Sequence, residues 1–147
     1  MQTRAAPLLS ILLGVLSGCV SDEVESVVEV GWVDYAGDLA IIEVPATATR
    51  GVPFPLRVST VAGGCMRVES TEVSSTSDAL DLTPYDRRVV PSEGEACTAA
   101  LVHLLHEEWV TFDSAGPKTV RIHGRRRLAQ PGVHIEMVQL LHTVMVQ

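Results

Sequence analysis

The chain has 147 residues, the size of one domain, and a formal net charge of −7 from 18 acidic against 11 basic residues. This excess of acidic side chains makes binding of nucleic acid through overall charge a poor hypothesis, so we expect no nucleic-acid partner. Three cysteines are present. Cys19 follows an apolar run, whereas Cys65 and Cys97 lie within the body of the chain.

Residues 1–18 have the pattern of an export signal. Arg4 precedes an apolar run over 5–16, and the tetrapeptide Leu-Ser-Gly-Cys at 16–19 follows at once. About a dozen helical residues rise only ~18 Å, against ~30 Å of bilayer hydrocarbon, so this run is too short to span a membrane. The tetrapeptide resembles the lipobox of bacterial lipoproteins, and the resemblance implies that the thiol of Cys19 carries a diacylglycerol.

This resemblance divides the chain into three parts. Residues 1–18 are expected to be a cleaved signal peptide, residues 19–29 an acidic tether and residues 30–147 the folded domain. Two or three acyl chains hold a protein on a bilayer, at about 0.8 kcal/mol per buried methylene. We therefore expect a membrane-anchored protein of the bacterial cell envelope, with the domain in the periplasm or at the cell surface. Val20 follows the cysteine, which in lipoproteins of enteric-type bacteria favours the outer over the inner membrane.

The remaining cysteines, Cys65 and Cys97, form an even pair in an exported chain, which predicts a disulfide. A bridge that closes a loop of about thirty residues should add roughly 3–4 kcal/mol to the free energy of unfolding. Two buried free thiols are the alternative. A metal pair is disfavoured because neither cysteine lies in a C-x-x-C pattern.

Strand patterns dominate from residue 27 onward, with glycine or proline turn signals at intervals of about ten residues. The clearest period-two stretch is 52–61, in which Phe54, Leu56, Val58 and Thr60 share one side. The other candidate strands are 27–35, 39–44, 65–73, 80–82, 85–90, 120–122 and 133–146.

The segment 96–109 fits two structures. Its Ala, Leu and Glu content and the spacing of Cys97, Leu101, Leu104 and Leu105 favour a helix. A strand would continue instead through Trp109 and the residues that follow. We favour the strand because the neighbouring segments are strands and tertiary context overrides propensity.

These patterns predict an all-β fold, an antiparallel sandwich of about seven to nine strands. Residues 41–45 (IIEVP), 51–58 (GVPFPLRV) and 63–65 (GGC) resemble the opening strands of bacterial immunoglobulin-like lipoprotein domains. Residues 112–116, followed by 120–122, resemble the corner between late strands of such a domain, although the tyrosine of a tyrosine corner is absent. The resemblance implies an immunoglobulin-like sandwich and names no activity.

The histidines are the candidates for metal binding. His103 and His106 would share one face of a helix but lie on opposite faces of a strand. His123 and His134 could face one another across a hairpin-like connection over 124–132, as in a two-histidine copper or zinc site. We expect no metal and no other cofactor, and His103, His123 and His134 are the candidates if a metal binds.

The sequence offers little support for catalysis. There is no Gly-x-Ser-x-Gly motif and no glycine-rich phosphate loop, and acid pairs such as Glu107-Glu108 suit a solvated surface. We therefore expect no enzyme. Arg125, Arg126 and Arg127 form the densest basic patch, either as a solvated loop or as a contact for an acidic partner.

The sequence thus predicts a lipid-anchored cell-envelope lipoprotein that acts as a non-enzymatic structural or protein-interaction module. Besides the membrane, its expected partner is another envelope protein or polymer, contacted through loops such as 73–81 and 91–96. The alternative is a periplasmic metal- or small-solute-binding protein that uses its histidines.

Overall fold

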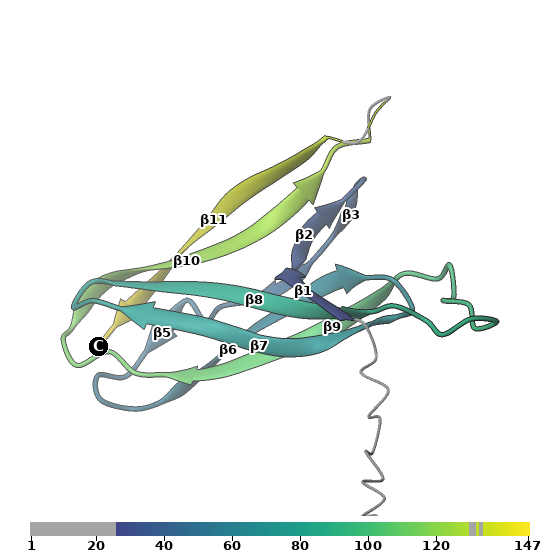
Figure 1. The fold of residues 1–147 in the computed structure, drawn as a ribbon. Coiled ribbons are helices and arrows are strands. Elements are labelled where there is room, and N and C mark those ends of the chain that lie inside the picture. Colours follow the sequence, from purple (N-terminus) through teal and green to yellow (C-terminus); the bar gives the residue numbers. More distant parts are fainter. Residues whose placement is uncertain (1–25, 130–131, 133) are drawn as a thin grey trace, which may run out of the picture.

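A computed structural model describes residues 26–129, 132 and 134–147, and these residues form an all-β fold without a helix (Figure 1). The predicted signal peptide and the lipidation site Cys19 lie outside the described residues. Eleven strands are present in the described part: β1 (Ser26–Val30), β2 (Trp32–Tyr35), β3 (Asp38–Leu39), β4 (Ile41–Glu43), β5 (Thr47–Ala48), β6 (Phe54–Ala62), β7 (Met66–Ser75), β8 (Ala79–Val89), β9 (Val102–Val110), β10 (Gly116–Arg127) and β11 (Ile135–Val146).

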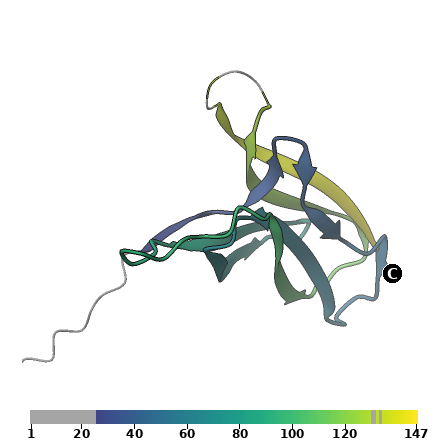
Figure 2. The same cartoon turned by 90° about the vertical axis from the view of Figure 1, so that its right-hand side faces the viewer.

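The strands form one sheet that curls over itself into a half-barrel (Figure 2). The long antiparallel pairs are β7 with β8, β6 with β9 and β10 with β11. The sheet is mixed, because β10 runs parallel to both β8 and β2, and β11 runs parallel to β5. The all-β prediction is confirmed. The antiparallel arrangement of about seven to nine strands is met only in part, because the sheet also contains parallel pairs and has eleven strands in the described residues.

Two of these parallel pairs, β10 with β8 and β10 with β2, lie beside the point where the first two strands change neighbours. β1 pairs antiparallel with the second half of β8, and β2 then pairs parallel with the end of β10. Gly31 lies at this fork, where its N–H donates to Pro84 O at 2.8 Å and its carbonyl accepts from Arg125 N at 2.9 Å. Residues 26–29, assigned above to the tether, therefore belong to the sheet as part of β1.

β8 is one continuous strand and not the two short pieces expected on either side of Pro84. The N–H and C=O groups of a strand residue point to the same edge. Because the carbonyl of Pro84 bonds to Gly31, its missing N–H falls at the fork, where β8 exchanges β10 for β1 as its neighbour. A proline is tolerated there because it removes no regular ladder hydrogen bond.

The disputed segment 96–109 contains a strand, β9, that begins at Val102. Residues 97–101, which the strand interpretation also included, lie in the loop before it. Leu105 and Trp109, which contributed to the apolar pattern, point outward and are 53% and 63% exposed. β6 pairs with β9 along its whole length, from Val102 to Val110, so pairing with β6 overrides the helical propensity.

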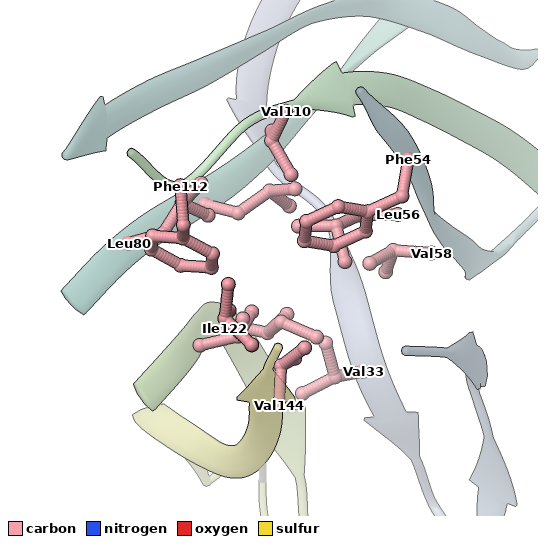
Figure 3. Packing of buried hydrophobic residues seen from close by; sticks show 12 residues of the cluster. Val33, Phe54, Leu56, Val58, Leu80, Val110, Phe112, Ile122 and Val144 are labelled. Atoms are coloured by element: carbon pink, nitrogen blue, oxygen red, sulfur yellow. The ribbon is translucent and has the colours of Figure 1, made fainter. Parts of the chain in front are cut away.

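The core lies between the two sides of the curled sheet (Figure 3). Phe54, Leu56 and Val58 of β6 are buried, as their period-two pattern predicts. Val120 and Ile122 of β10 meet them from the facing side and are fully buried. Burying side chains of this size stabilises the fold by ~1.5–3 kcal/mol each.

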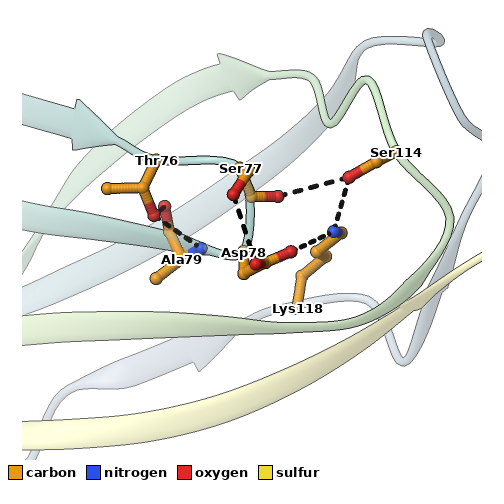
Figure 4. A network of polar contacts seen from close by, with 6 residues as sticks. All are labelled: Thr76, Ser77, Asp78, Ala79, Ser114 and Lys118. Carbon is orange, nitrogen blue, oxygen red and sulfur yellow. Dashed lines mark hydrogen bonds and ion pairs between the residues drawn. The ribbon is translucent and has the colours of Figure 1, made fainter.

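Beside this core, at the end of the half-barrel that contains Phe54, a polar network joins two turns (Figure 4). Lys118 is buried, and its Nζ donates to Asp78 Oδ1 and Ser114 Oγ, both at 2.7 Å. This hydrogen bond from Lys118 is the main reason that the pKa of Asp78 is lowered. The turn between β7 and β8 is thereby fixed to the loop that precedes β10.

Candidate functional site

A pocket of about 610 Å³ opens at the other end of the half-barrel. Its walls come from the ends of β6 and β8, the turn 63–65 with the first residue of β7, and the loop 97–101. Two residues of β2 and single residues of β1, β10 and β11 complete them. Most of the lining side chains are apolar, and the charged ones are Glu29, Arg88 and Arg125. Small-molecule sites have volumes of roughly 300–1,000 Å³ and similarly apolar walls.

Arg125 is a charged residue of this pocket with contacts to both an aromatic ring and a carboxylate. Its guanidinium carbon lies 4.0 Å from the ring centroid of Trp32, and its Nη1 donates to Glu29 Oε2 at 3.0 Å. The side chain is only 13% exposed, and its Nε and Nη2 atoms are buried without a hydrogen-bond partner in the described residues. A stacked guanidinium with unused donors is a positive group suited to an acidic neighbour.

The basic run expected as a loop or an acidic-partner contact is part of strand β10. Arg127 contacts the hydroxyl of Tyr35 and lies over its ring, with the guanidinium carbon 4.9 Å from the centroid. Arg126 has its Nε 3.2 Å from Asp34 Oδ2, close enough for an ion pair but without hydrogen-bond alignment. Of the three arginines, only Arg125 lines the pocket.

The predicted disulfide between Cys65 and Cys97 is confirmed, with a Cα–Cα distance of 5.2 Å. It fixes the turn between β6 and β7 to the loop before β9, and both cysteines line the pocket. The two segments pack so closely that a Cβ atom at Gly64 would lie only 1.9 Å from Thr98 Oγ1. The disulfide therefore holds the rim of the pocket in place.

The three candidate metal ligands are not brought together. His103 contacts Ser59 O, His123 Nε2 lies 2.8 Å from Asp81 Oδ1, and His134 contacts Glu136. β10 extends to Arg127, so His123 faces Gln139 and not His134. Within the described residues, no group of three or more His, Cys, Asp or Glu side chains is arranged to hold a metal ion.

The contact between His123 and Asp81 instead stabilises the pairing of β8 with β10. The hydrogen bond from His123 is the largest cause of a lowered pKa at Asp81, and Arg121 contributes a second ion pair at 3.0 Å. These contacts join β8 to β10 beside their parallel ladder.

A second polar cluster, missed by the sequence analysis, lies inside the half-barrel. Asp86 and His106 are buried, and His106 Nε2 lies 3.0 Å from Asp86 Oδ1. Thr60 donates to Asp86 Oδ2 at 2.8 Å, and Thr71 lies 3.1 Å from His106 Nδ1. These four side chains come from β8, β9, β6 and β7 in turn, so the cluster links the two sides of the curled sheet.

The order threonine, histidine, carboxylate superficially matches that of a catalytic triad. Asp86 and His106 are buried, however, and neither lines the pocket. The signal that could have revealed the cluster is alternation, because Asp86 shares the inward side of β8 with Leu80 and Leu82. We interpret the cluster as structural.

Comparison of the chain with protein-family models, with curated proteins and with solved structures finds no match. None of the described residues belongs to a helix long and apolar enough to cross a bilayer.

Proposed function

We propose that this chain is a lipid-anchored, non-enzymatic binding module of the bacterial cell envelope, and that the pocket beside Arg125 and Trp32 receives its partner. The lipobox-like tetrapeptide at 16–19 supports the anchor. The similarity of residues 41–45 and 51–58 to immunoglobulin-like lipoprotein domains supports a divergent sandwich of that kind. The observation that carries the binding role is the pocket itself, which is mostly apolar and contains a stacked arginine.

The pocket lies next to the point where the chain enters the fold. Ser26, the first residue of β1, pairs with Val89, which lines the pocket. If Cys19 is lipidated, six residues lie between it and Ser26, and the seven extended Cα–Cα steps span at most ~25 Å. The pocket would then be held close to the membrane surface, so we expect its partner to be a membrane-associated component of the envelope.

The chemistry of the lining supports binding of an acidic, partly apolar group. Its charged side chains are Glu29, Arg88 and Arg125, and the rest of the lining is mostly apolar. Arg125 presents a guanidinium stacked on Trp32, Arg88 also lines the pocket, and Glu29 compensates part of the charge of Arg125. An apolar group flanked by a carboxylate, on a protein or another envelope component, fits this arrangement.

Crosslinking in cells tests this proposal. A photo-reactive phenylalanine analogue replaces Leu101, which is in the pocket lining, or Trp109, which is exposed near the opposite end of the half-barrel. We expect a discrete crosslinked partner from position 101 that is lost on adding Arg125→Met, and no such product from position 109. Equal products from both positions, or none from position 101, would contradict a binding role for the pocket.

The anchor is tested separately, by labelling with radioactive palmitate. We expect the label in the natural chain and none in the Cys19→Ser variant, which should no longer be held on the membrane by lipid. A label that persists in Cys19→Ser would show that the anchor was assigned to the wrong residue.

A further inference from the structure

One edge of the sheet is left open along β11. β11 pairs with β10 over its whole length on one edge, whereas on its other edge β5 pairs only with Met145 and Val146. The edge over 135–144 therefore has no strand neighbour among the described residues, and Figure 1 shows β11 at the margin of the fold. An open edge presents unpaired N–H and C=O groups to any other strand.

β11 lacks the features that usually protect an open edge. Proteins block such edges with lysine, proline, bulges or very short strands. β11 has twelve residues, contains neither lysine nor proline, and pairs with β10 without a shift in register. Its outward side is apolar, with Met137 63% and Leu141 66% exposed.

We propose that two copies of this chain associate through their β11 edges, as antiparallel strands related by a two-fold axis at Gln139. This register places Met137 opposite Leu141 of the second copy on the outward side. On the other side, Val138 lies opposite Leu140. Antiparallel pairing about a two-fold axis is self-complementary, because every contact occurs twice.

The polar side chains select this register. Glu136 and His142 are the ionisable residues of β11, and with the axis at Gln139 each Glu136 lies opposite His142 of the second copy. An imidazole N–H can donate a hydrogen bond to a carboxylate that faces it across a strand pair. Moving the axis by one residue would place Glu136 opposite Val144 or Leu140, which leaves the carboxylate against an apolar side chain. The register at Gln139 therefore pairs every residue over 136–142 with a compatible one.

Cysteine crosslinking tests the register directly on the full-length chain. Residues directly opposite in an antiparallel pair have Cα atoms ~4.5–5.5 Å apart, within the range of a disulfide. Gln139→Cys should therefore give a covalent dimer on mild oxidation. Thr143→Cys is the matched control, because it is exposed on the same side of β11 but would lie ~27 Å from its copy. We expect at least tenfold more covalent dimer from Gln139→Cys.

A charge exchange supplies an independent test. Glu136→Lys or His142→Glu alone should weaken the dimer measured by analytical ultracentrifugation. The first removes the carboxylate that faces His142, and the second places two carboxylates opposite one another. The double variant places lysine opposite glutamate and should restore association, which misfolding would not do. Circular dichroism checks that each variant keeps its strand content.

Three results would overturn the proposal. These are equal crosslinking at positions 139 and 143, failure of the double charge variant to recover association, and crosslinking of position 139 to a different protein. None of them bears on the pocket, which is tested by position 101.

Discussion

At the scale of single residues, Asp86 is a carboxylate inside the protein with two hydrogen-bonding side chains around it. His106 and Thr60 contact its two oxygens at 3.0 and 2.8 Å. Burial of an ionisable group is costly unless such partners compensate it, and loss of one partner leaves the others unsatisfied. The cluster should therefore be more sensitive to the loss of one member than to replacement of the polar pair by apolar side chains.

We predict that Asp86→Val lowers the free energy of unfolding by about 3–5 kcal/mol, because it leaves His106 buried without its main partner. The double variant Asp86→Val/His106→Leu should be more stable than Asp86→Val alone. Urea unfolding at pH 7 measures both. Asp38→Val is the control, since Asp38 is exposed and should change stability by less than ~0.5 kcal/mol. Additive losses in the double variant would contradict this interpretation.

The sequence pattern predicts that Thr60 of this cluster is buried, but it does not predict the contact between Asp86 and His106. Alternation along β6 placed Thr60 on the inward side, and the structure confirms that it is buried. Asp86 follows the same rule in β8, but Pro84 made this strand look like two pieces. The pairing of Asp86 with His106 could not be predicted, because it depends on how β8 and β9 face one another across the curled sheet.

At the scale of elements, the fork at Gly31 sets the mixed topology. β1 and β2 follow one another through this residue, and it contacts β8 and β10 through its backbone. A Cβ atom at Gly31 would lie 2.4 Å from Thr60 Cγ2 and 2.9 Å from Asp86 Oδ2. The backbone of the fork thus lies directly against the buried cluster, and only glycine leaves room for both.

We predict that Gly31→Ala lowers the free energy of unfolding by at least the ~1–3 kcal/mol typical of overpacking, because Thr60 and Asp86 are both fixed by hydrogen bonds. Gly63→Ala is the matched control, since a Cβ atom at Gly63 meets nothing within 4 Å. Thermal unfolding followed by circular dichroism compares the two variants. If the Gly31→Ala variant is as stable as Gly63→Ala, the backbone between β1 and β2 can move away from Thr60 and Asp86 without lowering the free energy of unfolding.

Strand identity was more predictable than strand pairing. The candidate segments 52–61 and 133–146 correspond closely to β6 and β11, because one side of each strand is apolar. The parallel pairing of β10 with β8 has no local signal, since it joins segments that are about forty residues apart in the sequence. The pocket is equally non-local, because its lining residues come from segments far apart in the sequence.

At the scale of the whole molecule, the two ends of the half-barrel are held differently. The end that contains Phe54 packs this ring against Phe112, at 6.1 Å between centroids, and includes the Lys118 network. At the pocket end, the disulfide holds the long loop between β8 and β9 against the turn after β6. The stability of the pocket rim should therefore depend on this covalent bond more than on core packing.

We predict that Cys65→Ala/Cys97→Ala lowers the free energy of unfolding by about 3–4 kcal/mol, because the 32-residue separation between the cysteines adds conformational freedom to the unfolded chain. Hydrogen exchange should show where the folded state also changes. We expect faster exchange in the turn and loop that the cysteines join, and unchanged protection in β10, whose Val120 and Ile122 are fully buried. Uniformly faster exchange would mean that the disulfide stabilises the molecule as a whole and does not specifically order the rim. Unchanged exchange rates at the rim would show that the disulfide is not needed to order it. The packing of Gly64 against Thr98 would then be sufficient to hold the rim in place.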